Sequence, residues 1–260
     1  TKSLTLNGTV GTLALNNLKV DAFILGINHN ASREGNNRIH WAIGKISGVQ
    51  IALCDSYYNN GYEDGRKAFN MNHWGNWNRG GWKGCDLRYD ILGSTNKAPS
   101  GYGSAAQAGR TGYDPVSYDI VNSPVANTLA AAFPKDVRKV LKTVTKYTDN
   151  VGNASGDTAG NVTASVDYFY LLAEHEVYGG SRTYANSYEK NYQAQYDYFK
   201  AGNSKQLYKH DARTTAVWGR LRSPYYSNHY YFSAVGSGAG GGVYFYVAGY
   251  SGGLFAGFST

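Results

Sequence analysis

Short apolar runs and alternating positions dominate the first part of the chain and predict β-strands. Residues 4–27 hold several short apolar runs, with Gly8 and Gly11 as turn positions between them. Apolar and polar residues alternate over 39–43, as in a half-buried strand, and a Ser-Gly turn then leads into the apolar run 49–53. These last two runs predict a β-hairpin.

Apolar residues at helical spacing, next to capping signals, predict three helices. A Ser-Pro start followed by an apolar stripe predicts a helix over 123–141, interrupted at Pro134. An Asn capping signal followed by Tyr and Phe at helical spacing predicts a second helix over 186–201. A shorter apolar stripe predicts a helix over 85–92.

Polar segments rich in Gly and Asn separate these elements. The longest irregular segment covers 94–121, and a second loop over 149–165 divides strands predicted at 143–147 and 166–172. Strands, then helices, then strands again indicate an α+β fold. We expect one domain, 1–260, made of N-terminal strands and loop, two loop insertions and a C-terminal segment: 1–38, 94–121, 149–165 and 218–260.

Charge and aromatic content narrow the classes of partner. The chain carries a formal net charge of +7, so weak attraction to acidic surfaces is expected. Its basic run over 135–142 is typical of a solvated helix face, and basic and aromatic residues are segregated along the chain. We therefore expect no nucleic-acid partner, with a basic nucleic-acid-binding protein as an alternative class. No apolar stretch is long enough to span a membrane, so no membrane insertion is expected.

Motifs for catalysis and for metal binding are missing from the sequence. Glu174-His175-Glu176 lacks the second His of a zinc helix, and we expect these residues at the exposed start of a turn. The other histidines have no metal-like spacing among themselves or with Cys54 and Cys85. No catalytic residue, metal or cofactor is therefore expected. Two Cys are too few for a disulfide-stapled scaffold, so we expect free thiols, with a single bridge as the alternative.

The C-terminal segment differs in composition from the rest of the chain. After Arg222 the sequence contains no Lys, Arg, Asp or Glu, and Tyr, Ser and Gly prevail. Such a mixture is typical of binding loops, because Tyr offers a large contact area while Ser and Gly adapt. A Gly-rich pair of edge strands or a low-complexity tail is the alternative. From Ser223 onward Gln, Met and Trp are also missing, as they would be after randomisation of the first two bases of AAY codons.

Several segments, in the order in which they occur, resemble the C-type-lectin-fold variable proteins of diversity-generating retroelements and related domains of bacteriophage tail proteins. The similar pieces are RIHWAIGKI, IALCDSYY, GGWKGCDLRYDILGS, FPKDVRKVLKTVTKYTDNVGN, DYFYLLAEHEVYG, QYDYFKAGNSK, VWGRLRSP and GGLFAGF. They extend the resemblance from about residue 20 to the end of the chain. The ending at 253–258 lacks the proline that this family often has there.

The resemblance implies a C-type-lectin-like fold with small twisted antiparallel sheets, two main helices and much loop. It implies a non-enzymatic receptor-binding protein at a phage tail tip, located in the virion or on an extracellular surface. Its partner would be a host cell-surface receptor, protein or glycan, and a homo-oligomer fits this role because weak sites gain from several copies. The enzymatic alternative is a formylglycine-generating type of oxidase on the same fold. Such an enzyme needs two reactive Cys close together late in the chain, whereas no Cys follows Cys85 here.

We expect the C-terminal segment to bind the ligand through aromatic anchors and polar contacts. The expected ligand-binding residues are Tyr225, Tyr226, Asn228, His229, Tyr231, Ser237, Tyr244, Tyr246, Tyr250 and Ser251. Residues on a strand alternate between its faces, so the competing interpretation places about half of the tyrosines inward. The Trp-rich loop at 73–82 is the alternative site. The residues assigned to the scaffold are Trp218, Arg222, Val235, Val243 and Phe258.

Overall fold

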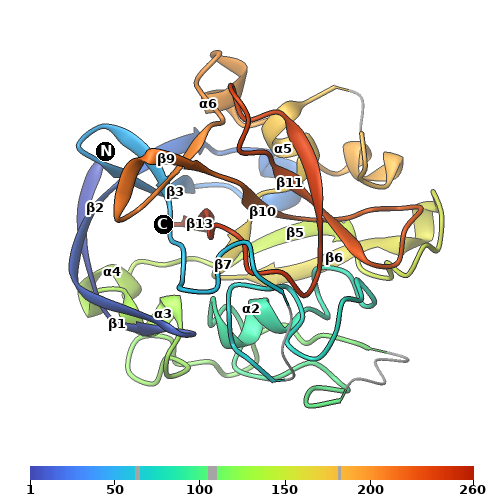
Figure 1. Cartoon of the computed structure of the whole chain (residues 1–260), viewed down its shortest axis with the longest axis horizontal. Helices are drawn as coiled ribbons and strands as arrows, with labels where there is room; N and C mark the ends of the chain where they lie inside the picture. The colour runs from blue at the N-terminus through green and yellow to red at the C-terminus, as the bar shows by residue number, and fades with distance from the viewer. Residues whose placement is uncertain (62–64, 105–109, 181–182) are drawn as a thin grey trace.

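The computed structural model describes residues 1–61, 65–104, 110–180 and 183–260, and shows a mixed α+β fold built mostly from sheets (Figure 1). The main sheet contains β1 (Lys2–Val10), β2 (Leu13–Ile27), β3 (Ile39–Ile46), β4 (Val49–Ala52), β7 (Phe169–Leu171), β8 (Leu207–Lys209), β9 (Ala212–Val217) and β13 (Ala256–Ser259). A second sheet contains β10 (Gly219–Pro224), β11 (Tyr231–Val235) and β12 (Val243–Val247). A third pairs β5 (Val144–Asp149) with β6 (Val162–Asp167).

The main sheet brings the two ends of the chain together. Its strands follow the order β1-β2-β3-β4-β8-β9, and β13 pairs with both β3 and β7. Phe258 of β13 is in register with Trp41 of β3 on one side and with Phe169 of β7 on the other. In Figure 1 the β1–β2 ribbon curves along the left side, while the C-terminus lies near the centre. The last strand of the chain is therefore an inner strand of the sheet.

Two hairpins form where alternation predicted strands. β1 and β2 pair antiparallel around a turn at Gly11, but Gly8 lies in a bulge of β1 and is not a turn, so that part of the prediction is wrong. β3 and β4 form the predicted hairpin, with Ile46 opposite Val49. Positive φ angles at Ser47 and Gly48 give this two-residue turn the twist that favours hairpins.

All described helices are short. They are α1 (Ala31–Glu34), α2 (Asp86–Asp90), α3 (Leu129–Ala132), α4 (Lys135–Arg138), α5 (Glu174–Tyr178) and α6 (Asp197–Lys200), with 3₁₀ turns η1 (Ala159–Asn161) and η2 (Ser187–Asn191). The prediction of a helix within 85–92 is confirmed by α2. Among the described residues, no helix has the length and apolar character needed to cross a membrane.

The long helix predicted over 123–141 does not form. The chain turns between residues 124 and 128, and Asn127 has a φ of 57°, which a right-handed helix cannot continue through. α3 begins only after Thr128, whose hydroxyl accepts from the Ala131 amide, and it ends before Pro134. α4 then adds a single further turn. The apolar stripe of the sequence is thus distributed over two short helices at an angle set by Pro134.

The helix predicted over 186–201 is also wrong, because tertiary hydrogen bonds compete with helix formation. The predicted cap is present, since the Asn186 side chain accepts from the Tyr188 amide. However, the backbone amide of Tyr196 donates to the carbonyl of Glu176 and not to that of Tyr192, as a continuous helix would require. The chain is therefore a 3₁₀ turn, an irregular piece and then α6.

The two predicted loop insertions have different outcomes. The described part of 94–121 contains no helix or strand, as predicted, whereas the predicted loop 149–165 ends early because β6 begins at Val162. Val162 pairs with Asp149 across the hairpin. The β5–β6 pairing therefore extends into a stretch for which the polar composition predicted a loop. The predicted strand over 166–172 is divided between β6 and β7.

A single hydrophobic cluster connects the N-terminal hairpin, α2, α3, β7 and β13. At its centre Phe133 lies 4.8 Å from Phe169 and 5.2 Å from Phe258, measured between ring centroids, and both contacts are edge-to-face. Cys54 and Cys85 are buried as free thiols, as predicted. Burial raises the pKa of each thiol to about 12.

Candidate functional site

The predicted binding segment folds around the three-stranded sheet β10-β11-β12. Direct cross-strand partners are Tyr231 and Val247, Ser233 and Phe245, and Ala234 and Tyr244. Opposed residues of an antiparallel pair lie on the same side of the sheet, so Phe245 and Tyr244 emerge on opposite sides of β12. β12 is also an edge strand of its sheet. The side chains of β12 are half-buried or exposed on both of its sides.

One side of β12 carries four aromatic rings in mutual contact. Phe245 lies 4.8 Å from Tyr231, 5.5 Å from Tyr225 and 4.9 Å from Tyr184, measured between ring centroids. Tyr184 comes from the segment after α5 and joins the group because its carbonyl accepts from the Tyr226 amide. The rings are tilted or edge-to-face, the geometries that aromatic pairs favour.

The row of rings continues to the Trp-rich loop. Tyr230 lies 5.1 Å from Trp77, and His229 stacks on the same indole at 5.2 Å. Asn78 fixes this junction, because its side-chain amide donates to the carbonyls of Asn228 and Tyr231 at 2.7 and 2.8 Å. The two sites proposed from the sequence as alternatives are therefore neighbours.

The other side of β12 packs on the scaffold. Tyr246 stacks face to face on the buried Trp218 indole at 3.7 Å, and the guanidinium of Arg220 lies 4.7 Å from the same indole. Tyr244 follows at 5.4 Å from Tyr246 and is 48% exposed. Tyr250 is 37% exposed and covers Gly61, where a side chain would meet its ring.

We call the connected rings the aromatic patch: Trp77, Tyr184, Tyr225, Tyr226, His229, Tyr230, Tyr231, Tyr244, Phe245 and Tyr246. Nine of the ten predicted ligand-binding residues are exposed or half-buried: Tyr225, Tyr226, Asn228, His229, Tyr231, Ser237, Tyr244, Tyr246 and Tyr250. Ser237 stands apart from the rings, in the Gly-rich turn between β11 and β12.

Ser251 is the exception, and its assignment to the binding face is wrong. Its side chain is 1% exposed, and its hydroxyl donates to the Asp55 carboxylate at 2.7 Å while accepting from the Phe69 amide. These bonds tie the end of the predicted binding segment to the scaffold. Of the residues assigned to the scaffold, Val243 is only half-buried and the other four are buried.

Three members of the aromatic patch were missed, namely Tyr184, Tyr230 and Phe245, whereas Trp77 lies in the loop that was predicted as the alternative site. Phe245 and Tyr230 lie inside the predicted segment, and the composition of that segment was the signal that could have identified them. Tyr184 is forty residues upstream, and only a tertiary hydrogen bond brings it to the patch.

Glu174 supports the aromatic patch from inside the protein. It was expected at an exposed turn, but Glu174, His175 and Glu176 are all buried in α5. The Glu174 carboxylate accepts from the amides of Tyr184 and Ala185 and from the Ser233 hydroxyl at 2.7 Å. Because hydrogen bonds to a charged group are about twice as strong as neutral ones, this carboxylate holds the Tyr184 segment against β11.

A second buried network lies beneath β10. The Arg222 guanidinium makes two hydrogen bonds to the Glu176 carboxylate, at 2.5 and 2.8 Å, and the Lys146 ammonium donates to Glu176 and to Glu34. These four side chains are at most 3% exposed. Burial would raise the pKa of Glu176, but Arg222 and Lys146 outweigh it and hold that pKa far below its usual range.

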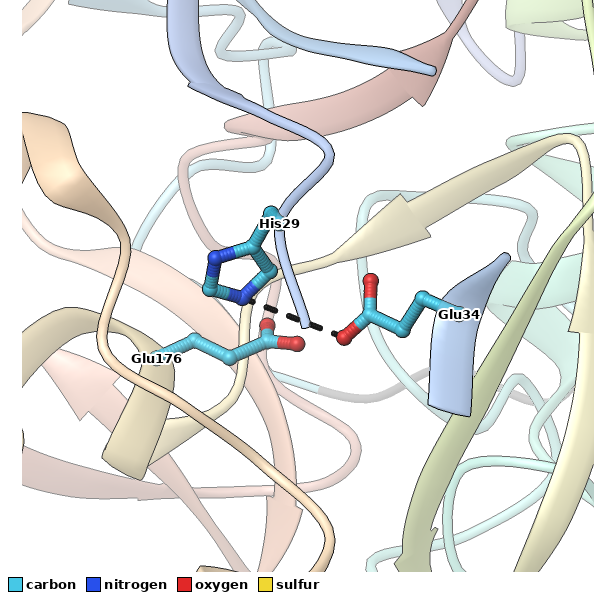
Figure 2. A group of neighbouring side chains, drawn as sticks. All are labelled: His29, Glu34 and Glu176. Atoms are coloured by element: carbon cyan, nitrogen blue, oxygen red, sulfur yellow. Dashed lines mark ion pairs between the residues drawn. The ribbon is translucent and has the colours of Figure 1, made fainter. Parts of the chain in front are cut away.

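His29, Glu34 and Glu176 form the one group, among the described residues, with ligand atoms close enough for a metal ion (Figure 2). Figure 2 shows the three side chains pointing toward one another, with His29 Nε2 3.9 Å from Glu34 Oε1. The Lys146 ammonium already lies 2.5 Å from Glu34 and 2.9 Å from Glu176. Together, the Lys146 ammonium and the Arg222 guanidinium balance the charges of the two carboxylates. The group therefore acts as an ion network that stabilises the scaffold, and a metal ion would have to displace Lys146.

Burial keeps the histidines of this network neutral. It lowers the pKa of His29 to about 3, with Lys146 contributing, and it lowers the pKa of His40 to about 2. Burial also raises the pKa of Glu34 to about 7, against the opposing effect of Lys146. His29 stacks on Tyr196 at 3.8 Å, so its ring acts as a packed aromatic group.

The comparisons with known proteins give a family without an activity. Neither curated proteins nor solved structures gave a match. The family described as a domain of unknown function (DUF6273) matches residues 53–249. That region runs from the end of β4 to just beyond β12, so it includes the whole aromatic patch and most of the buried ion network. Because this match covers well over half of the chain, the protein belongs to the DUF6273 family.

Proposed function

We propose that this protein is a non-enzymatic ligand-binding module with a C-type-lectin-like architecture, and that it recognises a host cell-surface receptor from the tip of a phage tail. The aromatic patch is its binding surface. The segment 225–250 is the part that a retroelement diversifies, and the site of action is the virion or an extracellular surface.

The aromatic patch is the observation that carries this proposal. Its rings form a continuous row from Trp77 to Tyr246, and the segment that supplies most of them has no Lys, Arg, Asp or Glu. Half-buried tyrosines combine a large contact area with few torsions to restrict, which makes them frequent anchors of binding surfaces. Tyrosine hydroxyl groups can exchange hydrogen bonds with polar groups of a receptor.

A separation between scaffold and surface supports the variable role of this segment. The buried anchors beneath the patch are Glu174, Trp218 and Arg222, which lie outside residues 225–250. Exposed residues such as Tyr244 make few demands on the core. A change of side chain there alters the surface and leaves the anchors in place.

The environment of the neighbouring carboxylates favours binding over catalysis. Glu174 and Glu176 are buried, and their oxygens accept hydrogen bonds from backbone amides, Ser233 or Arg222. A general acid or base must reach a substrate proton. These two carboxylates hold the scaffold together instead.

Three single variants test the proposal: Tyr231→Ser, Tyr244→Ser and, as a control, Tyr188→Ser. Tyr188 is 38% exposed on η2, outside the aromatic patch. Labelled protein is measured for binding to a panel of bacterial cells, and each variant is measured for thermal unfolding. We expect Tyr244→Ser to change the free energy of unfolding by about 0.5 kcal/mol or less. Loss of one central anchor should weaken binding by about 2 kcal/mol, or about thirtyfold.

Two results would contradict the proposal. If the patch variants and the control bind equally well, the receptor site lies elsewhere. If Tyr244→Ser unfolds the protein, its side chain belongs to the core. The diversification is tested separately in the source genome, where a near-copy of the coding sequence for the variable segment, differing at adenines and next to a reverse transcriptase, is expected.

A further inference from the structure

Two adjoining clefts form a groove beside the aromatic patch. One has a volume of about 700 Å³ and is lined in part by Arg79 and Arg110, and the other has about 690 Å³ and is lined in part by Lys97. Lys83 and Gly112 line both clefts and join them. We call the joined clefts the basic groove. The basic groove meets the aromatic patch at Trp77, whose ring lies 4.9 Å from the Arg79 guanidinium.

Positive charge in the basic groove exceeds negative charge. Lys83 is paired with Asp114 at 2.9 Å, and Arg110 is paired with the buried Asp86. No ion pair among the described residues involves Arg79 or Lys97. Within the part of the chain that the structure describes, these two cationic side chains thus have no carboxylate partner.

The environment of these two cations leaves their charge available. The Arg79 guanidinium donates through Nε to Asn153 Oδ1 at 2.7 Å and lies 4.9 Å from the Trp77 indole. The Lys97 ammonium lies 3.7 Å from the centre of the Tyr113 ring. Neutral amides and aromatic faces position a cation without cancelling its charge.

Arg110 adds an unsatisfied donor in the wall of the groove. Its side chain is buried, and Nε has no hydrogen-bond partner among the described residues. Its terminal nitrogens are engaged by Asn72 and Asp86. A buried donor without a partner costs free energy that an arriving acceptor would recover.

Neutral polar groups on the groove suit sugar hydroxyls. Asn153, Thr111 and Thr163 line it with exposed side chains that can both donate and accept hydrogen bonds. Sugar hydroxyls need both kinds of partner. Phosphodiesters of a nucleic acid offer acceptors only, so they would leave the acceptor oxygens of these side chains without partners.

We propose that the basic groove binds an acidic glycan, with carboxylate or sulfate groups at Arg79, Lys97 and Arg110 and sugar hydroxyls at the amides and threonines. The Trp77 and Tyr113 rings beside the cations offer faces for the apolar sides of the sugars. This binding stands whether or not the aromatic patch recognises a receptor.

The test compares two double variants of the full chain that remove the same charge. Arg79→Gln/Lys97→Gln changes the basic groove, and Lys135→Gln/Lys139→Gln changes exposed positions at α4. Lys97→Gln alone is a milder variant at an exposed side chain. The probes, measured by calorimetry, are a galacturonate hexamer, a heparin hexasaccharide, neutral maltohexaose and a short single-stranded DNA. The first two probes separate carboxylate from sulfate recognition.

We expect at least one acidic oligosaccharide to bind, with about tenfold weaker binding to the groove variant, unchanged binding to the α4 variant and no binding of maltohexaose. Lys97→Gln should give an intermediate loss. Equal losses in both double variants would overturn the proposal, because they would report net charge alone. The absence of acidic-glycan binding, or DNA binding as tight as that of the acidic probes, would also overturn it. No residue of the aromatic patch is substituted in any variant, and Lys97→Gln also leaves the contact between Arg79 and Trp77 in place. Failure here therefore leaves the proposed receptor site untouched.

Discussion

Replacing Arg222 by methionine removes the cation that neutralises Glu176 in the core. Arg222 is fully buried, and its guanidinium donates to Thr148 and to the Leu171 carbonyl as well as twice to Glu176. In the variant, Lys146 alone would face two buried carboxylates, which leaves one negative charge uncompensated. We expect a loss of about 3–5 kcal/mol in the free energy of unfolding, a large part of the total of a typical domain.

The complementary variant Glu176→Gln leaves the opposite imbalance, because Arg222 and Lys146 then face only Glu34. The double variant Arg222→Met/Glu176→Gln restores balance, with one cation and one carboxylate. We therefore expect the double variant to be more stable than the sum of the single losses predicts, by about 2–3 kcal/mol of coupling.

Urea unfolding followed by tryptophan fluorescence measures all four proteins of this cycle. The exposed pair of Lys200 and Asp197, 3.5 Å apart, provides a matched control cycle, for which coupling of at most about 1 kcal/mol is expected. Additive losses in the Arg222 cycle would refute the reasoning. So would single variants that cost less than the control.

The remaining predictions concern pH and the thiols. Burial lowers the pKa of four histidines, three of them to about 2 or 3. Below about pH 6.5 the unfolded chain therefore binds protons that the folded chain does not, and the free energy of unfolding falls as the pH is lowered. Three acids with pKa values raised by burial to about 6 or 7 act in the opposite direction until about pH 4.5. The free energy of unfolding, measured with urea, should therefore change little from about pH 6.5 to 4.5. Below about pH 4.5 Glu176, whose pKa lies far below its usual range, acts together with the three histidines, and the free energy of unfolding should fall by about 5 kcal/mol per pH unit. A steep fall above about pH 5 would contradict this. The groups are His29, His40 and His73, with His210 as the fourth histidine, and Glu34, Asp86 and Glu189. For the thiols, a disulfide-exchange reagent should not label the folded protein at pH 8 but should label Cys54 and Cys85 after unfolding without reductant, and unlabelled unfolded protein would mean a bridge.

Local patterns in the sequence predicted local structure well. The β3–β4 hairpin depends on alternation and a Ser-Gly turn, and α2 depends on a short apolar stripe, so neighbouring residues determine both. The longer helices failed for a non-local reason. The backbone amide of Tyr196, for example, donates to the carbonyl of Glu176, twenty residues upstream, so it cannot bond the carbonyl four residues before it as a helix requires.

The candidate site was predicted in outline only. Composition located the segment with the exposed tyrosines, because an uncharged, Tyr-rich stretch is unusual anywhere in a chain. It could not show that Ser251 turns inward to Asp55, or that Tyr184 joins the rings. The buried ions were missed because Glu34, Lys146 and Arg222 come from three distant segments, and no spacing in the sequence connects them.

Because β13 is an inner strand at the end of the chain, folding depends on an intact reading frame in the segment before it. Residues 225–250 precede Ala256–Ser259, which pairs with β3 and β7 inside the main sheet. A substitution in the segment leaves this strand in place, whereas a stop codon or a frameshift there removes it. Chains with such errors would lack an inner strand and the Phe258 contacts with Phe133 and Phe169. Only chains translated in frame to their end would then fold. Truncated members of a library of variants would therefore be lost before any of them met a ligand.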